Sequence, residues 1–282
     1  MIIWLASYPK SGNTWLRSMI ASYYYTKNGE FNFGILDKIE QFPSFNYFKN
    51  YKDKFERPQD TVKYWSQAQE EINKDKKIKF LKTHSALCKI EDQVFTDQKN
   101  TLGAIYIVRD PRNVINSIFN HFDKNSQQEA LDFMKDEKRC LLDKENNRYL
   151  GFVPLFSWKM HQNSWNKNKI FPTLTIRYED LQSRTFKTFE KVFNFIKSIT
   201  KSNQSFNREK AKKVVQSCEF SKMQKMEKEK GFPEAVMNKS ENKKINFFHL
   251  GAKNNYKELL NKEIVDEMNS VFKDQLKEFK YE

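Results

Sequence analysis

The fold is decided by one stretch, Ser7-Tyr8-Pro9-Lys10-Ser11-Gly12-Asn13-Thr14-Trp15. The apolar residues before it, Ile2–Ala6, predict a buried strand, and the amphipathic residues 14–25 predict a helix. A strand, a tight polar loop and a helix bring several backbone N–H groups and the positive end of the helix dipole to one point. Residues 7–15 therefore predict a phosphate-binding loop, which we call the phosphate loop.

Individual residues of the phosphate loop suit contact with an anion. Gly12 lets the backbone approach closely, Thr14 adds a hydroxyl, and Lys10 can reach charge that develops on a leaving phosphate oxygen. The loop departs from the Walker A pattern because its lysine precedes the glycine and the first glycine is missing. This departure disfavours a nucleoside triphosphate site. The alternative is a helix capped by Asn13 or Thr14 beside an exposed lysine.

Outside the phosphate loop, short apolar runs alternate with longer amphipathic stretches. The further runs that predict buried strands are residues 79–82, 104–108 and 173–176. The stretches that predict helices are residues 61–72, 113–122, 154–166 and 179–196. Strands that alternate with helices are typical of an α/β fold, with a central parallel sheet flanked by helices.

The whole chain reads as one domain, residues 1–282. Its length allows one full core, and seven glycines and seven prolines indicate no long flexible linker. Residues 28–60 are rich in Phe, Tyr and Asn without a clear period, so we expect an irregular lid or acceptor segment. Residues 206–282 predict a helical, lysine-rich C-terminal region, interrupted near residues 231–248.

The formal net charge of +14 favours an anionic partner, although a solvated surface explains the same charge. The densest stretch, residues 197–230, holds ten basic and four acidic residues, a net charge of +6. Composition does not choose among nucleic acid, membrane phosphates and an anionic nucleotide as the partner.

The cysteines and the apolar runs bear on the cellular compartment. Cys88, Cys140 and Cys218 lack metal-ligand spacing, and their odd number argues against a full disulfide framework, so we expect reduced thiols. No apolar run approaches the roughly 20 residues that span a bilayer, and the first six residues are too short and uncharged for a signal peptide. We therefore expect a cytoplasmic protein with no transmembrane segment.

The phosphate loop closely resembles the 5′-phosphosulfate-binding loop of the cytosolic-type sulfotransferases, which depend on 3′-phosphoadenosine-5′-phosphosulfate (PAPS). Their usual form has Thr where Asn13 stands. The resemblance implies a P-loop-containing, sulfotransferase-like fold with PAPS as the cofactor. It also implies that the cofactor is bound by Lys10, Ser11, Gly12, Asn13, Thr14 and Trp15.

The second predicted strand ends in Lys82-Thr83-His84. A histidine at the carboxyl end of a parallel strand lies at the edge where ligands bind, and a pKa near about 6.5 suits a proton acceptor. A lone histidine is nevertheless more often structural. The family carries Lys-Thr-His at this place, so the resemblance implies His84 as catalytic base and Lys82 as a contact of the sulfuryl group. His121 and His161, within helical patterns, keep the structural interpretation.

The third predicted strand leads into Arg109, and Ser117 follows about two turns into the next helix. An Arg fork with a hydroxyl can hold a second, separate phosphate. The pair resembles the family's 3′-phosphate motif, with the same spacing of eight residues. The alternatives are an Arg109 paired with a local carboxylate and an ordinary helix serine.

Three weaker matches complete the resemblance. Tyr178, in Arg-Tyr-Glu-Asp-Leu, resembles a tyrosine near the nucleotide, and Phe220 resembles one that packs on adenine, opposite Trp15. Both Phe220 and Trp15 could instead be core residues. Where many members carry Arg-Lys-Gly at the 3′-phosphate, this chain has His249, Leu and Gly251, so only the glycine survives. The loss of two cations weakens the expected 3′-phosphate site unless His249, Lys253 or a neighbour compensates. The family's dimerisation segment is not recognisable, so the oligomeric state stays open.

The resemblance implies a sulfotransferase that moves a sulfuryl group from PAPS to a hydroxyl or amine and releases 3′,5′-ADP without a metal. The acceptor, a small molecule, saccharide or lipid, has no recognisable motif. The first alternative is a P-loop nucleoside kinase, supported by the strand that ends in Asp110. The second is a non-enzymatic nucleic-acid- or membrane-surface-binding protein that uses residues 197–230. The intervening Arg109 and the missing Gly-Lys-Ser/Thr argue against the kinase. The second alternative does not explain phosphate-type motifs in this order, and we expect no nucleic-acid partner.

Overall fold

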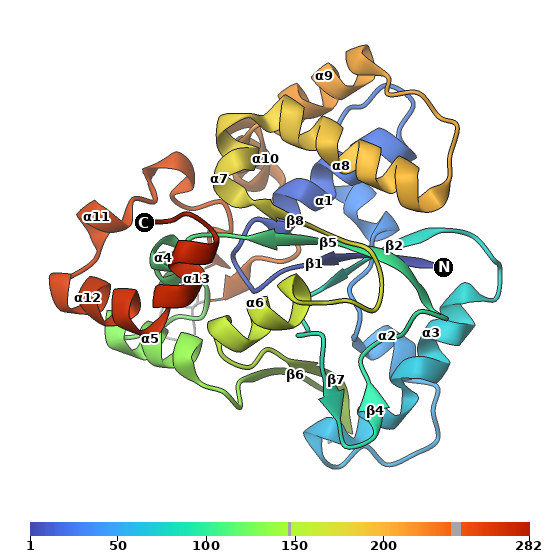
Figure 1. Cartoon of the computed structure of the whole chain (residues 1–282), viewed down its shortest axis with the longest axis horizontal. Helices are drawn as coiled ribbons and strands as arrows, with labels where there is room; N and C mark the ends of the chain where they lie inside the picture. The colour runs from blue at the N-terminus through green and yellow to red at the C-terminus, as the bar shows by residue number, and fades with distance from the viewer. Residues whose placement is uncertain (146–147, 238–243) are drawn as a thin grey trace.

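The computed structural model describes residues 1–145, 148–237 and 244–282, and a sheet of parallel strands lies at its centre (Figure 1). The strand order is β2-β1-β5-β8. These strands are β1 (Ile2–Ala6), β2 (Lys79–Thr83), β5 (Thr101–Val108) and β8 (Thr173–Arg177). The predicted α/β fold with a central parallel sheet is confirmed.

The register of the sheet brings the predicted motifs to one edge. Ala6, the last residue of β1, pairs with Thr83 of β2 and with Tyr106 of β5. Because parallel strands end at the same edge, the phosphate loop meets the segments that follow β2 and β5.

Helices cover both faces of the sheet because the side chains of β1 alternate between two cores. Trp4 lies in one core with Trp158 and Trp165 of α6 (Trp158–Asn166). Leu5 lies in the other core, against helices α1 (Asn13–Tyr25), α8 (Thr185–Thr200) and α9 (Arg208–Ser217), and Figure 1 shows α8 and α9 opposite α6. Burial on both faces explains why all of β1 is apolar.

The remaining elements surround this sheet. The other α-helices are α2 (Phe45–Phe48), α3 (Trp65–Asn73), α4 (Pro111–His121), α5 (Gln127–Lys135), α7 (Tyr178–Ser183), α10 (Phe220–Lys230), α11 (Tyr256–Leu259), α12 (Lys262–Val271) and α13 (Lys273–Glu278). The 3-10 helices are η1 (Phe33–Lys38), η2 (Pro58–Tyr64) and η3 (Gly251–Lys253). Three antiparallel pairs lie outside the main sheet: β3 (Lys89–Ile90) with β4 (Gln93–Val94), β6 (Cys140–Glu145) with β7 (Arg148–Pro154), and β9 (Val236–Met237) with β10 (Lys244–Ile245).

Three predicted helices have clearly different bounds in the structure. The stretch 61–72 is divided between the 3-10 helix η2, which ends at Tyr64, and α3, which begins at Trp65. The stretch 154–166 becomes helical only at Trp158, because Pro154 ends β7 and the Ser157 hydroxyl caps α6 by accepting from the Met160 N–H (3.3 Å). The stretch 179–196 is divided into α7 and α8 at Arg184, whose backbone is not helical. The sequence did not predict the β6–β7 hairpin, which pairs outside the main sheet.

Residues 28–60 contain only short elements, and their aromatic side chains enter the core. Phe42, Phe48 and Phe55 are fully buried, and the Phe42 ring lies 5.8 Å from the Trp4 ring. The segment also pairs beside the edge strand β2, since the Lys82 backbone N–H donates to the Glu40 backbone oxygen (2.8 Å). Of this segment, only Gln41 reaches the cavity described below.

The cysteines are all free, Cys218 buried and the other two half-buried. Within the described ranges, no helix has the length and apolar character needed to cross a membrane.

Candidate active site

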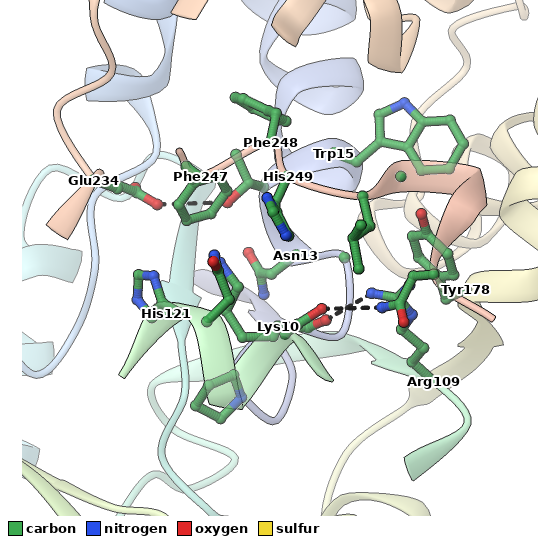
Figure 2. Close-up of a pocket in the computed structure, with 18 of the residues that line it drawn as sticks. Lys10, Asn13, Trp15, Arg109, His121, Tyr178, Glu234, Phe247, Phe248 and His249 are labelled. Carbon is green, nitrogen blue, oxygen red and sulfur yellow. Dashed lines mark hydrogen bonds between the residues drawn. The ribbon is translucent and has the colours of Figure 1, made fainter. Parts of the chain in front are cut away.

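A cavity of about 330 Å³ opens at the carboxyl edge of the sheet (Figure 2). It is lined by every predicted site residue except Ser11, whose hydroxyl is buried without a hydrogen-bond partner in the described part of the chain. The lining residues predicted from sequence are Lys10, Gly12, Asn13, Thr14, Trp15, Lys82, His84, Arg109, Ser117, Tyr178, Phe220, His249 and Gly251.

The phosphate loop is held to the sheet by Asn13. Its side-chain amide donates to the Leu5 backbone oxygen (2.9 Å) and to the Ser7 hydroxyl (3.2 Å). Gly12 has φ of +100°, and a β-carbon there would lie 2.5 Å from the Tyr178 ring, so only glycine fits. Among the described residues no side chain caps the start of α1, which leaves its first N–H groups available to an anion at the cavity wall.

Lys10 is half-buried and lies near the cations Lys82 and Arg109. Burial, with the nearby charge of Lys82, lowers the pKa of Lys10 to about 7. Its ammonium lies 3.7 Å from the centre of the Phe247 ring, and its backbone oxygen accepts from Arg109 (3.2 Å), as Figure 2 shows. An anion bound beside Lys10 would favour the charged form of its side chain.

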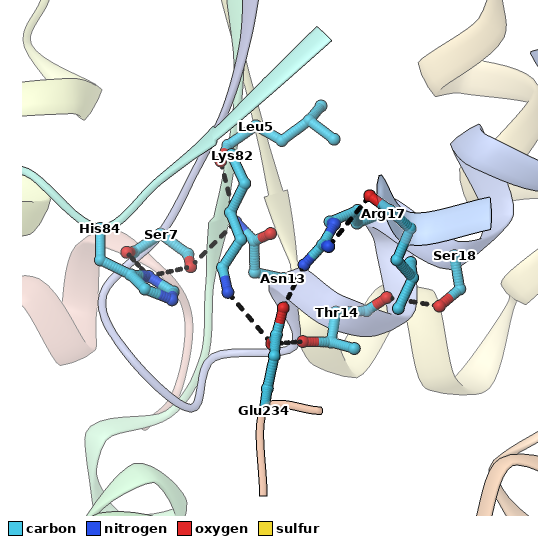
Figure 3. Close-up of polar contacts among 10 residues, drawn as sticks. Leu5, Ser7, Asn13, Thr14, Arg17, Ser18, Lys82, His84 and Glu234 are labelled. Carbon is cyan, nitrogen blue, oxygen red and sulfur yellow. Dashed lines mark hydrogen bonds and ion pairs between the residues drawn. The ribbon is translucent and has the colours of Figure 1, made fainter. Parts of the chain in front are cut away.

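Lys82 takes part in a buried ion network that the sequence did not indicate (Figure 3). Its ammonium donates to the carboxylate of Glu234 (3.1 Å), a residue between α10 and β9. The same carboxylate also pairs with Arg17 and accepts from the Thr14 hydroxyl (3.4 Å). Burial raises the pKa of Glu234, but Lys82 and Arg17 outweigh it and hold that pKa well below its ordinary value.

His84 has a defined tautomer. Its Nδ1 lies 2.8 Å from the Ser7 backbone oxygen, which can only accept, so Nδ1 carries the hydrogen and Nε2 keeps a lone pair. Burial, with the charge of Lys82, lowers the pKa of His84 to about 3. His84 is therefore neutral near pH 7, with Nε2 unprotonated.

His161 holds the backbone of His84 in place. Its Nε2 donates to the His84 backbone oxygen (3.1 Å), and the Tyr106 hydroxyl donates to its Nδ1 (3.0 Å). It is fully buried and does not line the cavity, as the structural interpretation predicted.

His121 differs from that interpretation because it lines the cavity. Burial, with the charge of Lys10, lowers its pKa to about 3. Figure 2 shows it on the side of the cavity that holds Lys10. Its place at the end of α4 follows from helix length, which periodicity alone did not relate to the cavity.

Arg109 and Ser117 lie at the cavity with a third polar residue, Asn254. The Asn254 amide donates to the Ser117 hydroxyl (3.2 Å) and to the Asn113 backbone oxygen (2.8 Å). The local carboxylate, Asp110, pairs with Arg112 (2.8 Å) instead of Arg109. The Nε atom of Arg109 is buried without a hydrogen-bond partner among the described residues, which leaves a donor for an anion. Asn254 comes three residues after Gly251 in the sequence, but only the fold shows that it contacts Ser117.

Aromatic side chains surround the same end of the cavity. The Arg109 guanidinium lies 4.2 Å from the centre of the Tyr178 ring, and the centres of the Trp15 and Tyr178 rings are 5.8 Å apart. Gly251 has φ of +56°, and a β-carbon there would lie 2.5 Å from the Phe220 ring. These planar surfaces suit a nucleotide base.

Trp158 and Trp165 of α6 are buried core residues and do not line the cavity. The apolar cavity residues in contact with the His121 ring are Phe122 (5.0 Å between ring centres) and Phe247 (5.8 Å), and Leu141 also lines the cavity. Over the described ranges, no group of three or more His, Cys, Asp or Glu side chains is arranged to hold a metal ion.

Residues 2–280 match the family model described as the sulfotransferase domain. Comparison with curated protein sequences gives no match.

Solved structures with a similar fold include a mouse sulfotransferase complexed with PAP, at 19% identity and a TM-score of 0.57, covering 98% of this chain and 84% of that one. Retinol dehydratase in complex with androsterone and the inactive cofactor PAP has 15% identity and a TM-score of 0.61, covering 98% and 80%. Retinol dehydratase with retinol and PAP has the same identity and TM-score, covering 98% and 81%. At these identities the likeness concerns the fold.

Proposed function

The chain belongs to the sulfotransferase domain family, and on this premise we propose that it transfers a sulfuryl group from PAPS to a hydroxyl or amine of an acceptor. One observation carries the proposal. The phosphate loop, the Arg109–Ser117 pair and His84 line a single cavity, in the arrangement that a donor with two separate phosphates requires. The solved structures of similar fold that contain PAP, which is 3′,5′-ADP, support the same donor.

The residues present fit PAPS. The uncapped start of α1 and Lys10 suit the 5′-phosphosulfate, while Arg109, with its unpartnered Nε, suits the 3′-phosphate beside Ser117. Asn254 is the neighbour of Lys253 that compensates for the missing cations, because its amide donates to Ser117. When bound, PAPS supplies the sulfuryl group that is transferred.

The side chains then divide the reaction among them. His84 accepts the proton of the attacking hydroxyl at Nε2, and Ser7 holds its ring in the required tautomer. As the bond between sulfur and the bridging oxygen breaks, Lys10 and the N–H groups of α1 stabilise the charge on the departing 3′,5′-ADP. Lys82 holds the sulfuryl oxygens.

The acceptor enters on the side of His84 and His121. Phe122 and Leu141 favour an acceptor with an apolar part. A cavity of about 330 Å³ suits a small molecule better than an internal unit of a polymer chain. We further propose that residues 1–282 act as one catalytic domain in the cytoplasm, without nucleic acid.

The test is a panel of hydroxyl and amine acceptors incubated with labelled PAPS, with and without EDTA. We expect sulfuryl transfer in both conditions, because Lys10, Lys82 and Arg109 supply the positive charge that a metal would otherwise provide. A complete loss on chelation that magnesium restores would instead support a kinase-like enzyme.

A further inference from the structure

The carboxylate of Glu234 occupies a position in the cavity where a small anion is expected. It contacts Lys82, Arg17 and the Thr14 hydroxyl at once (Figure 3). Lys82 and Thr14 are residues that we propose bind PAPS. Three donors from β2 and α1 thus converge on a single anionic group, and the protein itself supplies that group.

Arg17 is the member of this group that no motif indicated. It lies on α1, one turn after Thr14, and is buried. One guanidinium nitrogen pairs with Glu234, another donates to the Leu36 backbone oxygen (3.1 Å), and Nε has no hydrogen-bond partner among the described residues. A buried cation with a spare donor, facing a second buried cation, is typical of an anion site.

On the basis of the proposed function, we propose that Arg17 binds the sulfuryl group together with Lys82, and that the Glu234 carboxylate takes the place of the sulfuryl group until PAPS binds. A carboxylate and a sulfuryl group both present oxygens to the same donors. Two anions cannot occupy one position between the same two cations, so the donor must displace Glu234.

Glu234 can leave without unfolding of the core. Its side chain is 28% exposed, whereas those of Arg17 and Lys82 are 8% and 7% exposed. The two cations are therefore fixed in the wall, whereas Glu234 is a partly exposed residue of the segment between α10 and β9. Because 3′,5′-ADP lacks the sulfuryl group, it leaves Glu234 in place. After transfer, Glu234 returns to Lys82 and Arg17, and these contacts stabilise the complex with 3′,5′-ADP relative to the complex with PAPS.

The test compares PAPS with 3′,5′-ADP by calorimetric titration in Glu234→Gln, Arg17→Ala and Arg17→Lys. Glu234→Gln should bind PAPS more tightly and raise the preference for PAPS over 3′,5′-ADP by about 10-fold, because a charge-assisted contact no longer has to be broken. The ratio is the decisive quantity, since loss of a negative charge improves binding of any anion. Glu190→Gln, in the surface pair with Arg208 (2.7 Å), is the matched control and should leave the ratio unchanged.

Arg17→Ala should lower the preference for PAPS by about 10-fold or more and slow transfer, while 3′,5′-ADP affinity changes little. Arg17→Lys keeps the charge and should retain part of the preference, which separates a binding role from misfolding. An unchanged or lower preference in Glu234→Gln would overturn the displacement, because Glu234 would then only hold Lys82 in place. An unchanged preference in both Arg17 variants would remove Arg17 from the sulfuryl site. Failure of the unmodified protein to bind 3′,5′-ADP would instead contradict the proposed function itself.

Discussion

The Nδ1 atom of His84 lies 2.8 Å from the backbone oxygen of Ser7, and this contact joins the end of β2 to the start of the phosphate loop. A carbonyl oxygen only accepts, so the contact determines which ring nitrogen of His84 can take a proton. The loop that holds the donor thus also sets the tautomer of the proposed base. Displacement of the loop would affect donor binding and proton transfer together.

The first prediction concerns His84 itself. Replacement by alanine should lower the rate of sulfuryl transfer by about 10²- to 10⁴-fold, because a general base is lost. The affinity for 3′,5′-ADP should stay nearly unchanged, since Nε2 serves the acceptor and not the nucleotide. Steady-state kinetics and calorimetric titration measure the two effects. Near-normal turnover in this variant would exclude His84 as the base.

The second prediction concerns the 3′-phosphate. The unmodified protein should bind 3′,5′-ADP roughly 10- to 150-fold more tightly than 5′-ADP or ATP, because Arg109 and its neighbours add charge-assisted contacts. Arg109→Ala should erase most of that preference, and Asn254→Ala a smaller part. Binding of 5′-AMP is the control and should weaken little in either variant. Equal affinities for 3′,5′-ADP and 5′-ADP in the unmodified protein would contradict the assignment.

The third prediction concerns the pH dependence of nucleotide binding. The pKa of Lys10 is lowered to about 7 by burial and by Lys82, and a bound phosphate should raise it. Affinity for 3′,5′-ADP should therefore fall as pH rises above 7, by at most about 10-fold per pH unit, with proton uptake on binding. Titration in buffers of different ionisation enthalpy measures that uptake. Lys10→Arg keeps its charge and should lose this dependence, and an equal dependence in the variant would assign it to another group.

The fourth prediction concerns stability in acid. The folded pKa values of His84, His121 and His161 are lowered to about 3, so the unfolded chain binds more protons between about pH 3 and about pH 6.5. The contribution of these histidines to the free energy of unfolding should therefore be complete above about pH 6.5. Below that pH the free energy of unfolding should fall, by at most about 1.4 kcal/mol per pH unit for each histidine. Urea unfolding at a series of pH values tests this. His121→Gln should reduce the slope by up to one proton, and a slope equal to that of the unmodified protein would refute the His121 contribution.

Much of the fold was predictable because it depends on local signals. The strands of the main sheet appear as apolar runs, since both faces of each strand are covered, and Asp110 with Pro111 marks the start of α4, where the Asp110 side chain accepts from Arg112 (2.9 Å). The β6–β7 hairpin was missed because it pairs outside this sheet. Residues 28–60 were expected to form an irregular lid or acceptor segment, because the absence of a period does not reveal that Phe42 and Phe48 pack into the core.

The sequence by itself determined the phosphate loop, Lys82-Thr83-His84 and the Arg109–Ser117 pair, because each belongs to a strand end or to the loop or helix that directly follows it. The tertiary structure decided the rest of the site. Glu234 lies 152 residues from Lys82 along the chain, and Asn254 lies 137 residues from Ser117. Such contacts leave no periodic or local signal, because they exist only after helices from separate parts of the chain have packed over one edge of the sheet.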